Sequence, residues 1–458
     1  YTPKGAIQVL TAENPTEFYD KYVKTGEVLT ITNPMTVRKE MLGKVAEYKN
    51  TAYQLDFGLA MVTETVVNKV VKPSPKKANF NKVGVNIDGK QVFAGSTNYY
   101  HVTADYSQYK GIQADKSRIA QGFFIADDYP EDVLDVLSDG IKLSDSKGQE
   151  VKGLKYTIYE SIEKAPEVVR NALIERGFKP KGAFQVWEAE NPEEFYAKYV
   201  QTGDTITIIN PMKVKEQFGK TGGKYENTAY QIDFGVAEET TTEVNNIPKF
   251  ETKKDVVISI GDKESKDGQK ITLGQIFYYS FTGTLIPSNR ADDLFEYKFV
   301  DDYQETHDRF DGKYKVIAKR DFVTADGKHF KAGDDLTTYA WLKEDKAKGQ
   351  LEIGLKEEFL RSITKESEFQ ADVFVEMTRI QAGEVENKVS HIVNGIEVSS
   401  NTVKTHTDVP PTPTKPTPKT PQLPNTGGKE TAAMSVAGYG LLALLGLSFL
   451  GRKRKEDK

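Results

Sequence analysis

Alternating apolar and polar residues recur through most of the chain and predict short β-strands. Residues 204–208, 256–260 and 373–377 read DTITI, VVISI and VFVEM, and a period of two places every second side chain on the same face of a sheet. In the last run Val373, Val375 and Met377 share one face. The aromatic residues are 23 Tyr and 23 Phe against 2 Trp, a composition that favours strands. We therefore expect a mainly β protein.

Short helices are predicted between the strands. Asn14 and Asn191 each precede a proline and a nearby glutamate, the pattern of a helix N-cap with proline in the first turn. Residues 166–176 form another candidate helix, which Gly177 would end. Strand-rich segments with such insertions predict tandem β-sandwich modules with short helical insertions.

The chain repeats itself. Residues 4–58 match residues 181–235 without a gap, and more than half of the aligned positions are identical. Residues 123–129 (FFIADDY) also resemble residues 297–303 (YKFVDDY). Repeats of this kind indicate tandem modules. We predict a truncated first module at 1–71, which would be the C-terminal half of a module that starts before Tyr1, a second module at 72–245 and a third at 246–408.

The C-terminal region has four parts in a fixed order. Residues 409–422 are proline-rich, which predicts an extended linker that spans the cell wall. The pentapeptide Leu423, Pro424, Asn425, Thr426 and Gly427 follows. Residues 431–450 are uncharged and largely apolar, about long enough to cross a bilayer as a transmembrane helix. Residues 452–455 (RKRK) form a basic cluster that should stay in the cytoplasm.

This order resembles the LPxTG cell-wall sorting signal of Gram-positive surface proteins, here at 423–458. The resemblance implies that a sortase cleaves between Thr426 and Gly427 and joins Thr426 to peptidoglycan. The protein would then be extracellular and covalently attached to the cell wall, with membrane contact only through the span before sorting. The alternative is a plain single-pass anchor in which LPNTG occurs by chance.

Composition excludes several classes of function. The chain has no Cys, so disulfides, zinc–cysteine sites and thiol catalysis are absent. Its 62 Lys and Arg against 67 Asp and Glu give a net charge of −5, which offers no support for nucleic-acid binding. Residues 219–221 (GKT) lack the earlier glycine of a phosphate-binding loop, where Val214 stands, and no HExxH or GxSxG motif occurs. We expect no enzyme and no required cofactor.

The modules resemble the C-terminal region of the streptococcal antigen I/II adhesins over nearly the whole chain. The residues that carry the resemblance are KGAFQ at 181–185, NPEEFY at 191–196, GKTGGKYEN at 219–227, and the Asp-Asp-Tyr segments at 127–129 and 301–303. It implies stacked immunoglobulin-like domains that present an adhesive head, with host salivary or matrix glycoproteins and other bacteria as partners. It also implies calcium as a structural ion. Asp301, Asp302 and Asp308 are candidates, but no EF-hand loop fixes the ligands.

The resemblance further suggests intramolecular isopeptide bonds. Such a bond needs a lysine, an asparagine and an acid buried together, because burial lowers the pKa of the amine and raises that of the acid. The second module offers Lys77, Asn227 and Asp127 or Asp128, and the third offers Lys254, Asn387 and Asp301 or Asp302. We predict Asp127 and Asp301, because alternation places them on the aromatic face of their strands.

Several alternatives stay open at this point. Lys76 and Lys253 compete with their neighbours for the amine role, since a shift of one residue exchanges the two faces of a strand. Asn50 is the equivalent of Asn227 in the first module, but its lysine would precede this chain, so it should be unlinked. The same residues could instead be a solvated lysine, a turn asparagine and a surface or calcium-binding loop. A pilus backbone subunit and a wall-anchored enzyme are the alternative functions.

Overall fold

The computed structural model describes residues 5–38, 41, 46–71 and 73–410. The sorting signal and nearly all of the proline-rich linker lie outside these described residues, and so does the predicted membrane span at 431–450. Within the described part of the chain, no helix is long and apolar enough to cross a membrane. The fold below is that of residues up to Val409, which form a unit by themselves.

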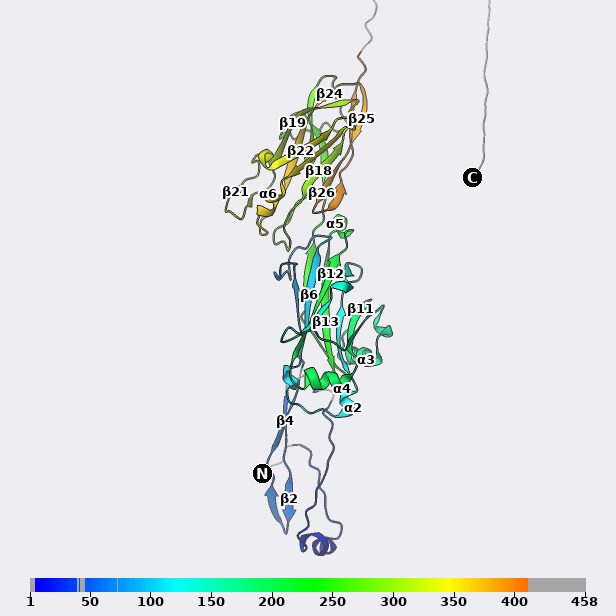
Figure 1. Ribbon diagram of the computed structural model, residues 1–458, viewed down its shortest axis with the longest axis vertical. Helices are drawn as coiled ribbons and strands as arrows, with labels where there is room; N and C mark the ends of the chain where they lie inside the picture. The colour runs from blue at the N-terminus through cyan, green and yellow to red at the C-terminus, as the bar shows by residue number, and fades with distance from the viewer. Residues whose placement is uncertain (1–4, 39–40, 42–45, 72, 411–458) are drawn as a thin grey trace, which may run out of the picture. The chain divides into compact units, whose positions relative to one another are not determined.

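The fold is mainly β with sandwich-type sheets, as the alternation predicts (Figure 1). The run 373–377 lies in β24 (Ala371–Arg379), where Val373, Val375 and Met377 are all buried. The prediction for 256–260 is wrong in position, because β16 covers Lys253–Val257 and the chain turns after it. The amide N–H of Asp262 donates to Ser259 O in that turn. The specific immunoglobulin-like topology stays a prediction.

Strands β5 to β15 form two sheets that we call the middle sandwich. The first sheet has the strand order β5 (Lys76–Phe80), β6 (Thr97–Asp105), β12 (Thr205–Val214) and β8 (Leu134–Val136), with β9 (Lys142–Asp145) also paired to β12. The second sheet has the order β10 (Leu154–Tyr159), β11 (Phe184–Ala189), β7 (Phe123–Asp128), β13 (Gly223–Asp233) and β14 (Val236–Glu239), with β15 (Glu243–Ile247) paired to the first half of β13.

The second sheet of the middle sandwich is covered on both faces. Phe123 and Ile125 of β7 pack in the core between the sheets, whereas Phe124 and Ala126 pack in a second apolar cluster. Helix α3 (Glu167–Glu175) supplies part of that outer cluster and ends before Gly177, as predicted. Because both faces are buried, β7 reads as a continuous apolar run and its alternation does not mark one inner face.

Strands β16 to β28 form the C-terminal sandwich. Its first sheet has the order β16, β17 (Ile276–Thr282), β24 and β19 (Asp308–Ala318). Its second sheet has the order β22 (Ala340–Asp345), β23 (Gln350–Leu355), β18 (Tyr297–Asp302), β26 (Val389–Val393) and β27 (Ile396–Ser399). Two separate ladders join β25 (Gly383–Asn387) to β28 (Val403–Thr407) and β20 (Phe322–Val323) to β21 (His329–Phe330).

Residues 5–71 repeat the local structure of the middle sandwich without its burial. Helix α1 (Pro15–Phe18) continues into the π-helical turn η1 (Tyr19–Val23), as α4 (Pro192–Phe195) continues into η6 (Tyr196–Val200). The predicted caps are confirmed, since Asn14 and Asn191 accept from a backbone N–H three residues later. The remaining elements are β1 (Ala46–Asn50), β2 (Tyr53–Asp56), β3 (Leu59–Val62) and β4 (Val66–Val70).

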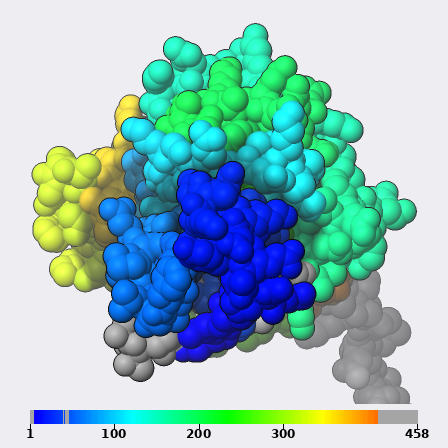
Figure 2. Space-filling model, turned by 90° about the horizontal axis from the view of Figure 1, so that it is seen from below, coloured from blue at the N-terminus to red at the C-terminus, as the bar shows by residue number. Residues whose placement is uncertain are grey.

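The apolar side chains of this N-terminal segment are solvent-exposed. Among the side chains described for residues 5–71, only Val70 is buried, and Figure 2 shows the segment in blue on the face nearest the viewer. In the middle sandwich the matching helix buries Phe195 and Tyr199. Residues 5–71 therefore have the same helix, π-helical turn and hairpin as the middle sandwich, with the side chains exposed in place of buried.

The hairpin β13–β14 carries a buried carboxyl group. Asp233 is only 1% exposed, and Gln231 Nε2 donates to its Oδ2 at 2.7 Å. Burial raises the pKa of Asp233 to about 7, although Gln231 and Tyr109 partly oppose this shift by hydrogen bonding. The folded state therefore holds a proton on Asp233 that the unfolded chain releases at much lower pH.

Replacing Asp233 by asparagine should stabilise the chain, and more strongly as the pH rises. The pKa is raised on folding, so this carboxyl lowers stability progressively between about pH 4 and pH 7, and the loss is constant above pH 7. At pH 8 the gain should reach about 2 to 4 kcal/mol, with little difference at pH 4. Urea unfolding between pH 4 and pH 8 measures it.

The matched control is Asp56→Asn. Asp56 has the same sequence context, and Gln54 Nε2 donates to its Oδ2 at 2.5 Å, but the residue is exposed. Because Asp56 lies on the surface, its replacement should change the free energy of unfolding by no more than about 0.5 kcal/mol. Equal pH dependence of the two variants would contradict the role of burial.

Candidate functional site

The C-terminal sandwich gathers one lysine, one aspartate and one asparagine in its interior, which we call the C-terminal cluster. Strand β16 buries Lys254 and exposes Lys253, and β18 buries Asp301 and exposes Asp302. Asn387, at the end of β25, is 3% exposed. The pleat of each strand thus selects the predicted member of each pair of neighbours.

Asp301 bridges the other two members of the C-terminal cluster. Lys254 Nζ donates to Asp301 Oδ1, and Asn387 Nδ2 donates to Asp301 Oδ2 at 3.3 Å. The amide oxygen of Asn387 is buried without a hydrogen-bond partner. One carboxyl group therefore lies within hydrogen-bonding distance of both an amine and an amide, as a proton carrier between them would.

Burial shifts both ionisable groups of the C-terminal cluster toward their neutral forms. It lowers the pKa of Lys254 to about 8 against the opposing charge of Asp301, and it raises the pKa of Asp301. The Lys254 amine lies 4.3 Å from the ring centroid of Tyr279 and 4.7 Å from that of Phe281. Desolvation of the pair favours the transfer of a proton from Lys254 to Asp301, which leaves a nucleophilic amine and a protonated acid.

A buried ion pair lies behind Tyr279. Tyr279 OH donates to Asp308 Oδ2 at 2.8 Å, and Arg379 Nε donates to Asp308 Oδ1 at 2.6 Å. Arg379 also donates to the hydroxyl oxygens of Thr405 and Thr407. The sequence analysis did not find Tyr279 or Arg379, because neither belongs to a recognisable motif.

This arrangement bears on the predicted calcium ligands. Asp301 and Asp308 each contact a buried cationic side chain, and Asp302 is exposed. Over the described ranges no group of three or more His, Asp or Glu is placed to hold a metal ion. Calcium binding stays a prediction with no assigned ligands.

The middle sandwich holds a second set of the same residues, which we call the middle cluster. Strand β5 buries Lys77 and exposes Lys76, and Lys77 Nζ donates to Asp127 Oδ1 on β7. Burial lowers the pKa of Lys77 against the charge of Asp127. The neighbouring Asp128 is only partly buried, its pKa is raised to about 6 by desolvation, and it accepts from the Lys181 backbone N–H at 3.2 Å.

Asn227 is fully buried in the middle cluster but is oriented differently from Asn387. Its Nδ2 faces Met212 Sδ at 3.9 Å, and its Oδ1 has no hydrogen-bond partner. The Oδ2 atom of Asp127 instead accepts from Asn210 Nδ2 at 3.1 Å. The structure therefore brings Lys77 and Asp127 together and places a second amide, missed by the sequence analysis, beside them.

Strand register nevertheless makes Asn227 the equivalent of Asn387. Asp127 is paired with Ala229 and Asp301 with Val389, and each asparagine lies two residues before that partner. Two residues apart on a strand means the same face. The first-module equivalent, Asn50, is exposed on β1 and so lacks the burial that the bond requires.

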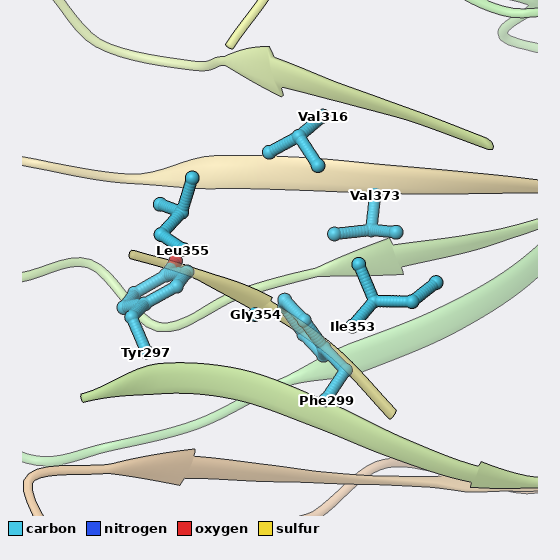
Figure 3. Close-up of a pocket in the computed structure, with 7 residues that line it drawn as sticks. All are labelled: Tyr297, Phe299, Val316, Ile353, Gly354, Leu355 and Val373. Atoms are coloured by element: carbon cyan, nitrogen blue, oxygen red, sulfur yellow. The ribbon is translucent and has the colours of Figure 1, made fainter. Parts of the chain in front are cut away.

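The cavity shown in Figure 3 belongs to the core of the C-terminal sandwich. It measures about 10 Å³ and is lined by Tyr297, Phe299, Val316, Ile353, Gly354, Leu355 and Val373. That volume is at the lower limit for a single water molecule. Tyr297 OH, the polar side-chain group of the lining, already donates to Thr284 O at 3.0 Å. The cavity is therefore a packing defect and offers no substrate site.

Family models match almost the whole chain. The model of the cell surface antigen I/II C2 terminal domain matches residues 1–70 and 75–247. The model of the cell surface antigen C-terminus matches residues 251–409, and the LPXTG cell wall anchor motif matches residues 415–458. The last match covers the predicted sorting signal.

Similarity to a known protein and to solved structures supports the same family assignment. The aggregation substance of Enterococcus faecalis is 34% identical over 413 residues, which is 84% of this chain and 30% of that protein. The chain thus spans about a third of the curated relative it matches. The C-terminal domain of the Streptococcus pyogenes antigen I/II-family protein AspA is 35% identical, with a TM-score of 0.68 over 73% of this chain and 99% of that one. The BspA C-terminal domain of Streptococcus agalactiae is 35% identical, with a TM-score of 0.64 over 72% and 99%.

Proposed function

The chain belongs to the antigen I/II family of cell surface antigens, and we propose that it is the stalk and C-terminal binding region of an adhesin. The LPXTG motif and the surface antigen domains indicate an extracellular protein attached to the cell wall. Sortase and peptidoglycan are the partners that this attachment requires. The three modules, with boundaries after residues 71 and 245, are part of the proposal.

Host salivary or matrix glycoproteins and other bacteria are the proposed adhesive partners. Family membership supports both classes, and the name of the enterococcal relative, aggregation substance, supports bacterial partners in particular. No contact residue is assigned to either partner. The sandwiches serve this function as a stable support and carry out no turnover of a substrate.

The two clusters are proposed to form the isopeptide bonds Lys254–Asn387 and Lys77–Asn227. A proton first passes from the lysine to the aspartate, which leaves a neutral amine. The amine nitrogen attacks Cγ of the asparagine and the new C–N bond forms. The aspartate gives its proton to Nδ2 as the Cγ–Nδ2 bond breaks, and it then takes up the second proton that the attacking nitrogen loses, so that it ends protonated. The products are one amide bond and one molecule of ammonia. The bridging position of Asp301 between Lys254 and Asn387 is the observation that carries this proposal.

The intact mass of the full chain tests the proposal. Two bonds should lower the mass by about 34 Da, which is about 17 Da for each ammonia lost. Tandem mass spectrometry should recover one peptide pair joined through Lys77 and Asn227 and another joined through Lys254 and Asn387. A chain with Asp127→Ala and Asp301→Ala should show the full theoretical mass. The full theoretical mass in the unaltered chain would remove the proposal.

A further inference from the structure

The middle cluster contains an amide that has no counterpart in the C-terminal cluster. Asn210 on β12 is fully buried, and its Nδ2 donates to Asp127 Oδ2 at 3.1 Å. In the C-terminal cluster the corresponding atom, Asp301 Oδ2, accepts from Asn387, the amide that would react. Asn210 therefore takes the hydrogen-bonding position that Asn227 would occupy if the two clusters were alike.

Strand register identifies what replaces Asn210 in the C-terminal sandwich. Asn210 is paired with Tyr100, and Val375 is paired with Tyr279. The two tyrosines are equivalent, because each ring lies beside the lysine amine of its cluster, at 5.0 Å for Tyr100 and 4.3 Å for Tyr279. Val375 has no polar side-chain atom, so nothing at that position competes for Asp301.

The competition also explains the orientation of Asn227. With Asp127 Oδ2 occupied, the amide of Asn227 has no carboxylate oxygen to donate to and faces Met212 Sδ at 3.9 Å. The amide oxygens of Asn210 and Asn227 are both buried without hydrogen-bond partners, so neither amide is fully satisfied in this arrangement.

We propose that Asn210 delays the Lys77–Asn227 bond by holding the oxygen of Asp127 that Asn227 must contact. The inference rests on the proposed crosslinking function. The reaction needs Asp127 to take a proton from Lys77 Nζ and deliver it to the departing Nδ2 of Asn227, so that ammonia leaves. Asp127 then takes up the second proton that the attacking nitrogen loses. While Asn210 donates to Asp127 Oδ2, that oxygen is not available to the amide of Asn227. Asn210 itself forms and breaks no covalent bond.

The rates of the two bonds in one chain test the inference. The full chain is made by cell-free synthesis, quenched with acid at successive times and digested, and both crosslinked peptides are quantified by mass spectrometry. Asn210→Leu keeps the number and branching of the side-chain heavy atoms and removes the amide, and Asn210→Val reproduces the residue of the C-terminal cluster. Both variants should increase the rate at which the Lys77–Asn227 bond forms by a factor of about 2 to 10, the range expected for the loss of one competing hydrogen bond. The Lys254–Asn387 bond should keep its rate and is the internal control.

The reciprocal variant Val375→Asn tests the same inference without changing the middle sandwich. It should lower the rate at which the Lys254–Asn387 bond forms by a similar factor and leave the rate of Lys77–Asn227 bond formation unchanged. If the unaltered chain forms both crosslinks and all three variants form them at the same rates as the unaltered chain, the proposed role of Asn210 is overturned and the crosslinks stand. A peptide pair joined through Lys77 and Asn210 would overturn it as well. Absence of ammonia loss from both clusters in the unaltered chain would overturn the crosslinks themselves and this inference with them.

Discussion

Replacing Lys254 by methionine is expected to leave the chain about 17 Da heavier than the doubly crosslinked form, after correction for the substitution, and to lower the free energy of unfolding by about 5 kcal/mol. The bond to Asn387 closes a loop of more than 100 residues, and the chain-entropy argument developed for disulfides gives that magnitude. Methionine fills the space of the lysine stem, so no large cavity adds to the effect.

Tryptophan fluorescence can measure this loss of stability in the C-terminal sandwich. It contains two tryptophans, of which Trp341 lies in the C-terminal sandwich and Trp187 in the middle sandwich. In a Trp187→Phe background, fluorescence-monitored urea unfolding reports on the C-terminal sandwich alone. The variant Asn387→Leu should show the same loss, because it removes the same bond from the other side.

Lys253→Met is the matched control for the first prediction. Lys253 is the adjacent residue on β16 and is exposed, so its replacement should change neither the mass deficit nor the unfolding midpoint appreciably. If Lys254→Met kept the mass deficit of the unaltered chain, Lys254 would not be the linked amine. An equal effect of Lys253→Met would instead point to a different strand register.

Asp308→Asn should destabilise the C-terminal sandwich by about 3 to 5 kcal/mol without altering its crosslink. Arg379 and Asp308 have no exposed side-chain surface, so the variant leaves a guanidinium in the core without its counter-charge. The cost of such an uncompensated buried charge exceeds the value of the pair itself. Urea unfolding of the Trp187→Phe chain measures the change, and the unchanged mass deficit separates it from the loss of the bond.

A surface ion pair provides the comparison for Asp308. Glu357 accepts from Arg361 Nε at 2.8 Å, but the two side chains are 61% and 47% exposed. Glu357→Gln should therefore cost less than about 1 kcal/mol. A similarly small cost for Asp308→Asn would show that water or another group compensates Arg379. The double variant Asp308→Leu with Arg379→Met should recover much of the stability, because it removes both charges from the core.

The sequence predicts the members of each cluster better than their contacts. Alternation chooses Asp301 over Asp302, and β18 buries the first and exposes the second. It leaves Lys254 and Lys253 both open, and the structure separates them by placing β16 at Lys253–Val257. The same reasoning also chooses Asp127 over Asp128, but it is weaker for β7, because both Phe123 and Phe124 are buried. Hydrophobic periodicity shows which face of a strand is buried, so it cannot distinguish the two faces of a strand in a sheet that is covered on both sides.

Contacts between distant strands explain what the sequence analysis missed. Asn210 lies in the repeated Asn-Pro-Met segment, which was recognised only as part of the repeat, and its contact with Asp127 depends on how two sheets pack. The Arg379–Asp308 pair likewise joins residues 71 positions apart on β24 and β19. No local pattern encodes such pairs. The π-helical turn after α4 was also missed, although the first copy repeats it at the same residues of the motif.

The positions of Lys254 and Asn387 have a mechanical consequence. Lys254 lies on the first strand of its sandwich and Asn387 close to the last, so the proposed bond would join the entry and exit of the domain directly. A pull applied between the host surface and the cell envelope would then pass through a short covalent route, and the strands between these residues would carry almost no tension. Changes in that bypassed region, including the hairpin of β20 and β21, could accumulate in evolution without weakening the tether.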